Sequence, residues 1–153
     1  MKNVEGFDIT LSKDCAKAFS KAVQLGTVVS LADGNPLAAF GDYHCENCQV
    51  CALAGRDHAQ CIQAHIWGMT EAKRFGGKYI YVCPMGLTFF TSPIIGSDGA
   101  KAKITAGPFL MIERQDYIAN DLLPKLQAPQ NAQLLAAEIE KIPEVPAPRV
   151  ESM

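Results

Sequence analysis

Five of the six cysteines in this 153-residue chain lie between Cys45 and Cys83. Cys45, Cys48 and Cys51 follow one another as C-x-x-C-x-x-C, and His44 directly precedes the first of them. Side chains at this spacing can converge on one metal ion where the backbone turns between them. Three thiols in so short a loop have no evident packing role. The spacing therefore predicts a metal site or redox chemistry in this segment.

A metal site would need ligands from beyond the cysteine triplet. Cys61 falls on the next predicted helix and Cys83 ends a predicted strand, so both are candidates. The match to the bacterial ferredoxin run is partial, because there the fourth cysteine follows much sooner. We expect either a zinc ion or an iron–sulfur cluster. The candidate ligands are Cys48, Cys51, Cys61 and Cys83.

Other roles for these side chains stay open at this point. Cys15 falls on an apolar helix face and is interpreted as a small buried hydrophobe. Cys83 as a nucleophile would need a histidine base, and nothing in the sequence assigns one. His58 and His65 share one face of a predicted helix, but no carboxylate motif accompanies them, so both are interpreted as solvent-facing or core side chains. Because no phosphate-binding, dinucleotide-binding or hydrolase motif occurs, we expect a binding domain and no enzyme.

Composition and charge narrow the class of protein. A hydrophobic share of 48% is enough for a real core, and a net charge of −2 argues against a nucleic-acid surface. No apolar stretch approaches the roughly 18 residues that span a bilayer. The first residues lack the pattern of a secretory leader, so we expect a cytoplasmic protein in which disulfides are disfavoured.

The chemistry-bearing residues are positioned by an alternation of helices and strands. Apolar spacing predicts helices over 11–25, 56–75, 114–125 and 130–141, the first with Leu11, Cys15 and Phe19 facing inward. Strands are predicted over 27–32, 37–40, 78–83, 87–95 and 100–111. Pro93 predicts an edge position or a bulge, and 42–55 reads as a loop entering a helix. The order indicates an α+β fold, an antiparallel sheet flanked by helices.

Residues 79–111 resemble the PocR sensory domain family. The resemblance is carried by YVCPMGL at 81–87, FF at 89–90, SPII at 92–95 and ITAGPF at 104–109. In that family a Cys-His-Ala-Gly-Leu type motif leads into an apolar strand with Pro-Ile. Here Pro84 and Met85 replace the histidine and the small residue, and Pro108 stands where the family often has glutamine. The resemblance covers roughly residues 5–150.

The resemblance implies a PAS-like fold that binds a small molecule. It implies a sensory domain over 5–142 and a linker over 143–153 toward an output module, either AraC-type or a histidine kinase. The function implied is small-molecule sensing within a bacterial signal-transduction or transcriptional regulator, with a metal or redox sensor on the same scaffold as the alternative. The ligand-binding candidates are Cys83, Met85, Gly86, Phe89, Phe90, Ile94 and Trp67.

The expected partners follow from the same resemblance. Because the family's polar residues are lost at Pro84 and Pro108, we expect a small apolar or weakly polar ligand. Members of the family are suggested to sense small hydrocarbon derivatives such as diols. A homodimer is a further open possibility, and no direct contact with nucleic acid or a membrane is expected.

Overall fold

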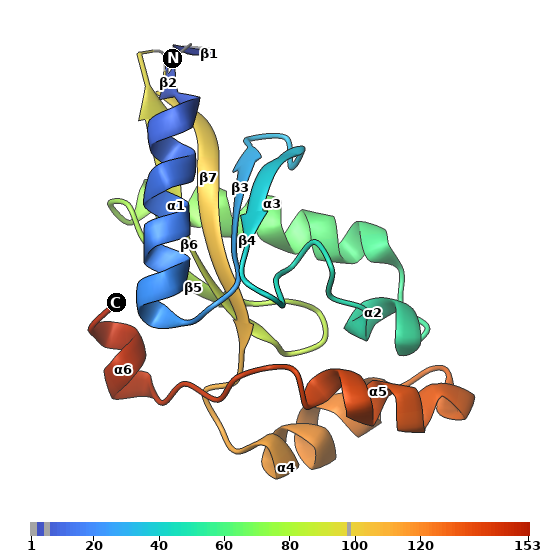
Figure 1. Cartoon of the computed structure of the whole chain (residues 1–153). Helices are drawn as coiled ribbons and strands as arrows, with labels where there is room; N and C mark the ends of the chain where they lie inside the picture. Colours follow the sequence, from blue (N-terminus) through green and yellow to red (C-terminus); the bar gives the residue numbers. More distant parts are fainter. Residues whose placement is uncertain (1–2, 5–6, 98) are drawn as a thin grey trace.

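A five-stranded antiparallel sheet forms the centre of the computed structural model, which describes residues 3–4, 7–97 and 99–153 (Figure 1). The strands follow the order β4-β3-β7-β6-β5 across the sheet. The neighbours β3 and β7 are therefore the first and last of these five strands along the chain. Their bounds are β3 (Thr27–Leu31), β4 (Pro36–Phe40), β5 (Tyr79–Val82), β6 (Thr88–Gly96) and β7 (Gly99–Phe109). The five predicted strands are confirmed, although Asp98 in the turn between β6 and β7 lies outside the described residues.

Short strands β1 (Asn3–Val4) and β2 (Phe7–Asp8) pair with each other before the main sheet begins. Pro93 lies on the part of β6 that has no partner in β5, whose pairing with β6 ends at Thr91. This agrees with the predicted edge position, since proline cannot donate a hydrogen bond to a neighbouring strand.

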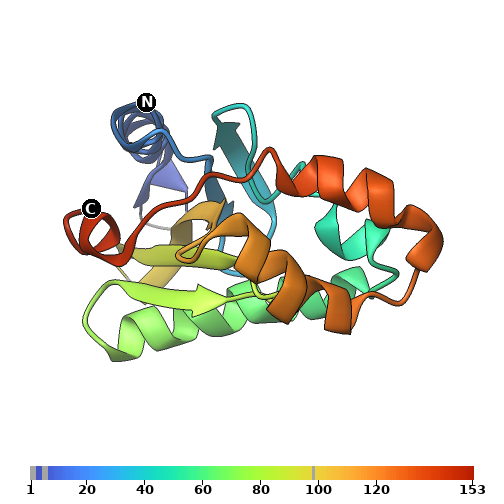
Figure 2. The same ribbon diagram turned by 90° about the horizontal axis from the view of Figure 1, so that it is seen from below.

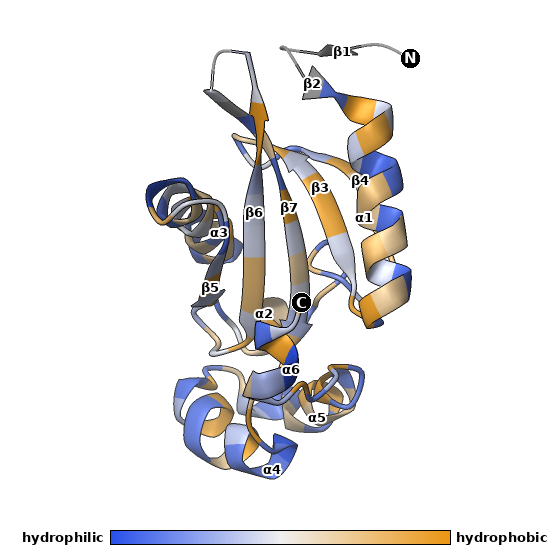
Figure 3. Cartoon of the chain, turned by 90° about the vertical axis from the view of Figure 1, so that its left-hand side faces the viewer, coloured by the Kyte–Doolittle hydropathy of each residue, from blue (hydrophilic) through white to orange (hydrophobic). Residues whose placement is uncertain are grey.

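Two long helices cover opposite faces of the sheet, α1 (Ile9–Val23) and α3 (His58–Arg74) (Figure 3). Successive side chains of a strand point to opposite faces, and Phe89 and Phe90 show this directly. The Phe89 ring lies 4.7 Å from the ring of His65 in α3, whereas Phe90 lies 5.5 Å from Phe19 in α1. The predicted α+β fold, with an antiparallel sheet flanked by helices, is confirmed.

Aspartates begin both helices. The carboxylate of Asp8 accepts a hydrogen bond from the Leu11 N–H at 2.9 Å, and that of Asp57 accepts one from the Ala59 N–H at 2.9 Å. Such side chains satisfy N–H groups that have no partner within the helix. Among the residues described, no helix has the length and apolar character needed to cross a membrane.

The inward face of α1 differs from the predicted one. Leu11 and Cys15 are exposed, and the side chains buried against the sheet are Ser12, Ala16 and Ser20. The serine hydroxyls donate to backbone carbonyls, that of Ser20 to Leu25 at 2.6 Å, so burying them leaves no polar group unpaired. The interpretation of Cys15 as a buried hydrophobe is therefore wrong.

The cysteine-rich segment crosses from β4 to α3 and contains one short helix, α2 (Val50–Leu53). Val50 is fully buried in the main core, and Cys45, Cys48 and Cys51 pack against that core from outside. The predicted loop thus forms a wall beside the sheet, because its apolar side chains hold it against the protein.

The C-terminal third forms a helical layer at one end of the sheet (Figure 2). Helix α4 (Arg114–Tyr117) continues as a π-helical turn (Ile118–Leu122) and a 3-10 turn (Leu123–Lys125), and a second 3-10 turn (Pro129–Asn131) leads into α5 (Ala132–Ile139). Tyr117 is fully buried, and its hydroxyl donates to the Met85 carbonyl at 2.6 Å. This layer therefore closes the end of the core where β5 turns into β6.

The last residues run back along the sheet. The Leu110 N–H donates to the Pro143 carbonyl at 2.8 Å, and the Val145 N–H donates to the Leu110 carbonyl at 2.7 Å. Helix α6 (Ala147–Glu151) follows, and its Val150 is buried in a cluster with Leu25, Phe109 and Val145. The segment 143–153 thus packs on the domain, and its continuation as a linker into an output module stays a prediction.

Candidate functional site

Two adjoining hollows lie between the sheet and the wall formed by α3 and the cysteine-rich segment. The first, which we call the polar chamber, has a volume of about 50 Å³, and the second, the cysteine chamber, about 220 Å³. Both are lined by Cys45, Glu46, His58 and Cys61, which form their common boundary. Since a buried water needs only 10–15 Å³ of such space, the two together have room for a small organic molecule.

Lys103 lies in the floor of the polar chamber. Register pairs of the sheet, Ser30 with Lys103 and Val28 with Thr105, place these four side chains on the face toward α3. Lys103 is only 3% exposed, and its Nζ has no hydrogen-bond partner. Burial lowers the pKa of Lys103 because the charged form loses its hydration.

His65 faces this chamber from α3. Its Nδ1 lies 2.6 Å from the Tyr81 hydroxyl, and its Nε2 is buried without a partner. Burial lowers the pKa of His65 to about 4, and the positive charges of Lys103 and His58 add to the effect. The imidazole is therefore neutral at physiological pH. Burial also raises the pKa of Tyr81, so its phenol keeps its proton.

Five cysteines surround the cysteine chamber. Those lining it are Cys45, Cys48, Cys51, Cys61 and Cys83. Burial raises the pKa of both Cys45 and Cys83 to about 12, so these thiols are protonated at neutral pH. A nucleophilic cysteine needs a lowered pKa, and the structure therefore gives Cys83 no means of acting as one.

Cys51 differs from the other cysteines. A hydrogen bond from the Cys61 thiol lowers the pKa of Cys51 to about 7 against the opposing effect of burial, and the charge of Arg56 lowers it further. The same hydrogen bond, together with burial, raises the pKa of Cys61. Cys51 is thus the thiolate-forming member of a thiol pair that joins α2 to α3.

The metal alternative is not supported. Across residues 3–4, 7–97 and 99–153, no three histidine, cysteine, aspartate or glutamate side chains are placed so that they could hold a metal ion. Cys48, Cys51, Cys61 and Cys83, the predicted ligands, line one chamber but do not converge on one point in it.

Comparison with known families decides what kind of domain this is. The model of the sensory domain found in PocR matches residues 5–153, almost the whole chain. The chain belongs to the PocR sensory domain family. A search of curated proteins found no match for this PocR sensory domain.

Two solved structures are similar in outline. One is the inducer-binding domain of the transcription factor PobR from Acinetobacter, a double mutant in complex with 3-hydroxybenzoic acid. It has 12% identity and a TM-score of 0.40, and the match covers 83% of this chain and 96% of that one. The other is a candidate transcriptional regulator from Rhodococcus sp. RHA1, with 17% identity, a TM-score of 0.34, and coverage of 82% and 65% respectively.

The residues predicted to bind ligand in this PocR sensory domain fall into separate places. Cys83 and Phe89 line the cysteine chamber. Met85 and Gly86 lie in the turn between β5 and β6, where the Gly86 N–H donates to the Cys83 carbonyl at 2.8 Å and Gly86 has a φ of +79°. That backbone conformation favours glycine. Cys-Pro-Met-Gly at 83–86, which stands in this chain at the place of the family motif, therefore forms a tight turn behind the chamber.

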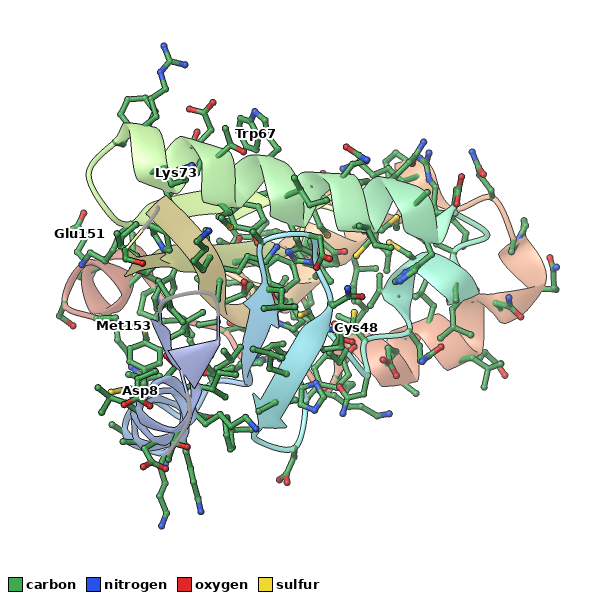
Figure 4. The ribbon with its side chains drawn as sticks, turned by 90° about the horizontal axis from the view of Figure 1, so that it is seen from above. Asp8, Cys48, Trp67, Lys73, Glu151 and Met153 are labelled. Carbon is green, nitrogen blue, oxygen red and sulfur yellow. The ribbon has the colours of Figure 1, made fainter. Side chains whose placement is uncertain are left out.

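The remaining predicted residues lie away from both chambers. Phe90 and Ile94 point from β6 toward the α1 face, opposite the chambers. Trp67 is 49% exposed and rests edge-on against Tyr79, with its ring at the outer surface of α3 (Figure 4).

Sequence reasoning missed the polar floor of the site. Lys103 stands in β7 between Ala102 and Ile104, but the strand also contains Lys101, so the sequence does not show which lysine is buried. His65 was read as a solvent-facing or core side chain, and its pairing with Tyr81 depends on a contact between α3 and β5. The chamber therefore combines residues that no single motif contains.

Glu138 of α5 holds the chamber wall in place. Its Oε2 accepts hydrogen bonds from the Tyr43 hydroxyl at 2.5 Å and the Gln49 N–H at 2.9 Å, and Lys141 pairs with Oε1 at 3.1 Å. Burial alone would raise the pKa of Glu138, but the hydrogen bonds from Tyr43, Gln49 and Lys141 together lower it. The segment that contains Cys45 and Cys48 is thereby tied to the C-terminal layer.

Proposed function

We propose that this PocR sensory domain is the ligand-binding part of a bacterial signal-transduction or transcriptional regulator, and that the two chambers hold its ligand. The observation that carries the proposal is a cavity with a buried, unpaired lysine in its floor and apolar side chains beyond it. Ligand sites are hollows of this kind, mostly apolar with a few placed polar groups. The high thiol pKa of Cys83 favours binding over catalysis.

Ligand binding is proposed to act on the C-terminal layer. The wall segment around Cys45 and Cys48 contacts the chamber on one side and Glu138 on the other. A ligand that moves this wall changes the position of α5, and the chain continues from α5 into 143–153. The downstream AraC-type or histidine-kinase module, and a homodimer, are further proposals that rest on the family resemblance.

A cavity-filling variant tests the proposed site. Cys61 lines both chambers, so Cys61→Phe should block ligand entry, whereas Cys15→Phe adds the same ring on the exposed face of α1. Binding would be measured calorimetrically with propane-1,2-diol, butyrate, benzoate and the amides of both acids. We expect wild type and Cys15→Phe to bind at least one compound and Cys61→Phe to lose that binding. Equal binding by all three proteins, or by none, would overturn the proposal.

Hydrogen exchange can test separately whether ligand binding affects α5. Hydrogen exchange of the α5 amides, measured with and without the bound compound, should change in wild-type protein. In Glu138→Gln the link to Tyr43 and Gln49 is weakened, so ligand binding should persist while the change in α5 becomes smaller. An α5 response of the same size in both proteins would show that the signal takes another route.

A further inference from the structure

Two buried nitrogen atoms of the polar chamber have no hydrogen-bond partner among the described residues. They are Nζ of Lys103 and Nε2 of His65. Buried polar groups in folded proteins are nearly always paired, and an unpaired buried cation is especially costly. Lys103 is only 3% exposed, so bulk water does not hydrogen-bond to its ammonium group. Both groups line the same hollow, which points to a partner that enters from outside the protein.

Both unpaired groups are hydrogen-bond donors. The Lys103 ammonium can only donate. Nδ1 of His65 lies 2.6 Å from the Tyr81 hydroxyl, which keeps its proton, and we assign the tautomer in which this phenol donates to Nδ1. With Nδ1 accepting, the imidazole hydrogen is assigned to Nε2, which then donates. The chamber therefore requires an acceptor.

No group of the described protein supplies that acceptor. The carboxylates that act on Lys103 are Glu46 and Asp33, both of which are exposed at the rim. Neither forms an ion pair with Lys103, and Asp33 instead accepts hydrogen bonds from Asn35 at 3.0 and 2.9 Å. Cys45 also lines the chamber, but its thiol is protonated at neutral pH. Lys103 thus has no hydrogen-bond or ion-pair partner inside the hollow, and the two carboxylates act on its charge only from a distance.

We propose that the polar chamber binds the carboxylate of a small organic acid, with Lys103 Nζ and His65 Nε2 as the donors. The inference rests on the proposed function and names the ligand class for that site. A carboxylate carries one negative charge and two acceptor oxygens, which match one ammonium and one imidazole N–H. The apolar part of the acid lies in the cysteine chamber, against Leu87 and Phe89.

The assignment changes the ligand expected from the family motif. The loss of polar residues at Pro84 and Pro108 predicted an apolar or weakly polar ligand, but neither residue lines either chamber. The polar recognition groups come from β7 and α3 instead. A neutral diol can use the same donors, but it leaves the charge of Lys103 without a counterion.

Pairs of acids and amides of equal shape test the charge requirement. Butyrate against butyramide and benzoate against benzamide would be titrated calorimetrically into the whole chain. Charged hydrogen bonds contribute enough that each acid should bind at least about tenfold more tightly than its amide. Lys103→Met and Lys103→Gln should weaken acid binding by at least about tenfold and weaken amide binding by less than they weaken acid binding. Lys101→Met, on the same strand outside the chambers, should bind as wild type.

The outcomes separate this inference from the proposed function. If amides or propane-1,2-diol bind as well as the acids, and Cys61→Phe still abolishes that binding, the carboxylate assignment is wrong while the sensing site stands. If both Lys103 variants bind acids with wild-type affinity, the assignment is also wrong. If no compound binds in a way that Cys61→Phe abolishes, the carboxylate assignment and the proposed site fail together.

Discussion

Tyr43 and Glu138 are 95 residues apart in the sequence and share a hydrogen bond of 2.5 Å. Tyr43 belongs to the segment that walls the chambers, and Glu138 belongs to α5. The bond connects the wall of the proposed ligand site with α5, which precedes the C-terminal segment 143–153. This connection gives the sensing proposal a physical route, because a change at the wall cannot leave Glu138 unaffected.

The Glu138 link should contribute strongly to stability. Glu138→Gln removes the charge from a buried carboxylate that Tyr43, Gln49 and Lys141 surround, so it should cost about 2–4 kcal/mol in the free energy of unfolding. Urea denaturation would measure the loss. Glu140→Gln, an exposed neighbour on the same segment, is the matched control and should change stability by less than about 0.5 kcal/mol. Equal effects of the two substitutions would contradict the role given to Glu138.

Acid should destabilise the protein through His65. The pKa of His65 is about 4 in the folded protein, whereas a histidine in the unfolded chain has the ordinary pKa of 6.5. Between these two pH values, His65 takes up a proton in the unfolded chain but not in the folded one. Stability contributed by His65 is therefore present above pH 6.5 and lost as pH falls toward 4, by up to about 3 kcal/mol.

His65→Asn removes this proton uptake and isolates the effect from other groups, including Glu138. The difference in unfolding free energy between wild type and variant should depend on pH in that window. Gln60→Asn, at an exposed position of the same helix that lines neither chamber, is the matched control and should keep the wild-type pH dependence. A constant difference between wild type and His65→Asn from pH 7 to 4 would mean that His65 titrates normally.

Lys103 should reduce the stability of the ligand-free protein. Lys103→Met replaces an unpaired buried ammonium by an apolar side chain of similar length, so the variant should be more stable by about 1–3 kcal/mol. Lys101→Met serves as the control outside the chambers. Thermal and urea unfolding without added acid would measure both. A Lys103→Met protein that is less stable than wild type would show that the ammonium already has a favourable partner.

Cys51 should be the most reactive thiol of the cysteine chamber. Because its pKa is about 7 and that of Cys83 is about 12, iodoacetamide at neutral pH should label Cys51 well before Cys83, and the Cys51 rate should rise as pH increases through 7. Mass spectrometry of digests would follow each site. A bound acid should slow labelling at Cys51, which lines the chamber. Faster labelling of Cys83 than of Cys51 would contradict these thiol states.

The fold followed closely from local patterns in the sequence. Short β-branched and apolar runs placed the five strands. The inward face of α1 was missed because Ser12 and Ser20 read as solvent-facing residues. Their burial depends on backbone carbonyls that accept from their hydroxyls, as Leu25 does from Ser20, and spacing alone does not show such partners.

The site was less predictable than the fold. The cysteine spacing pointed to a segment that lines the cysteine chamber, as Cys83 and Phe89 also do, but the metal interpretation assumed that nearby thiols converge. The polar floor depends on the pairing of β3 with β7 and on α3 crossing β5 and β6. Lys103 and His65 come together only through that tertiary arrangement, so no local pattern predicted it.

The most direct test of the account is a crystal structure of the domain grown with benzoate. We expect the carboxylate of benzoate to lie within hydrogen-bond distance of Lys103 Nζ and His65 Nε2, and its ring to pack against Leu87 and Phe89. Benzoate bound at another surface, or chambers that contain only water at saturating benzoate, would contradict it.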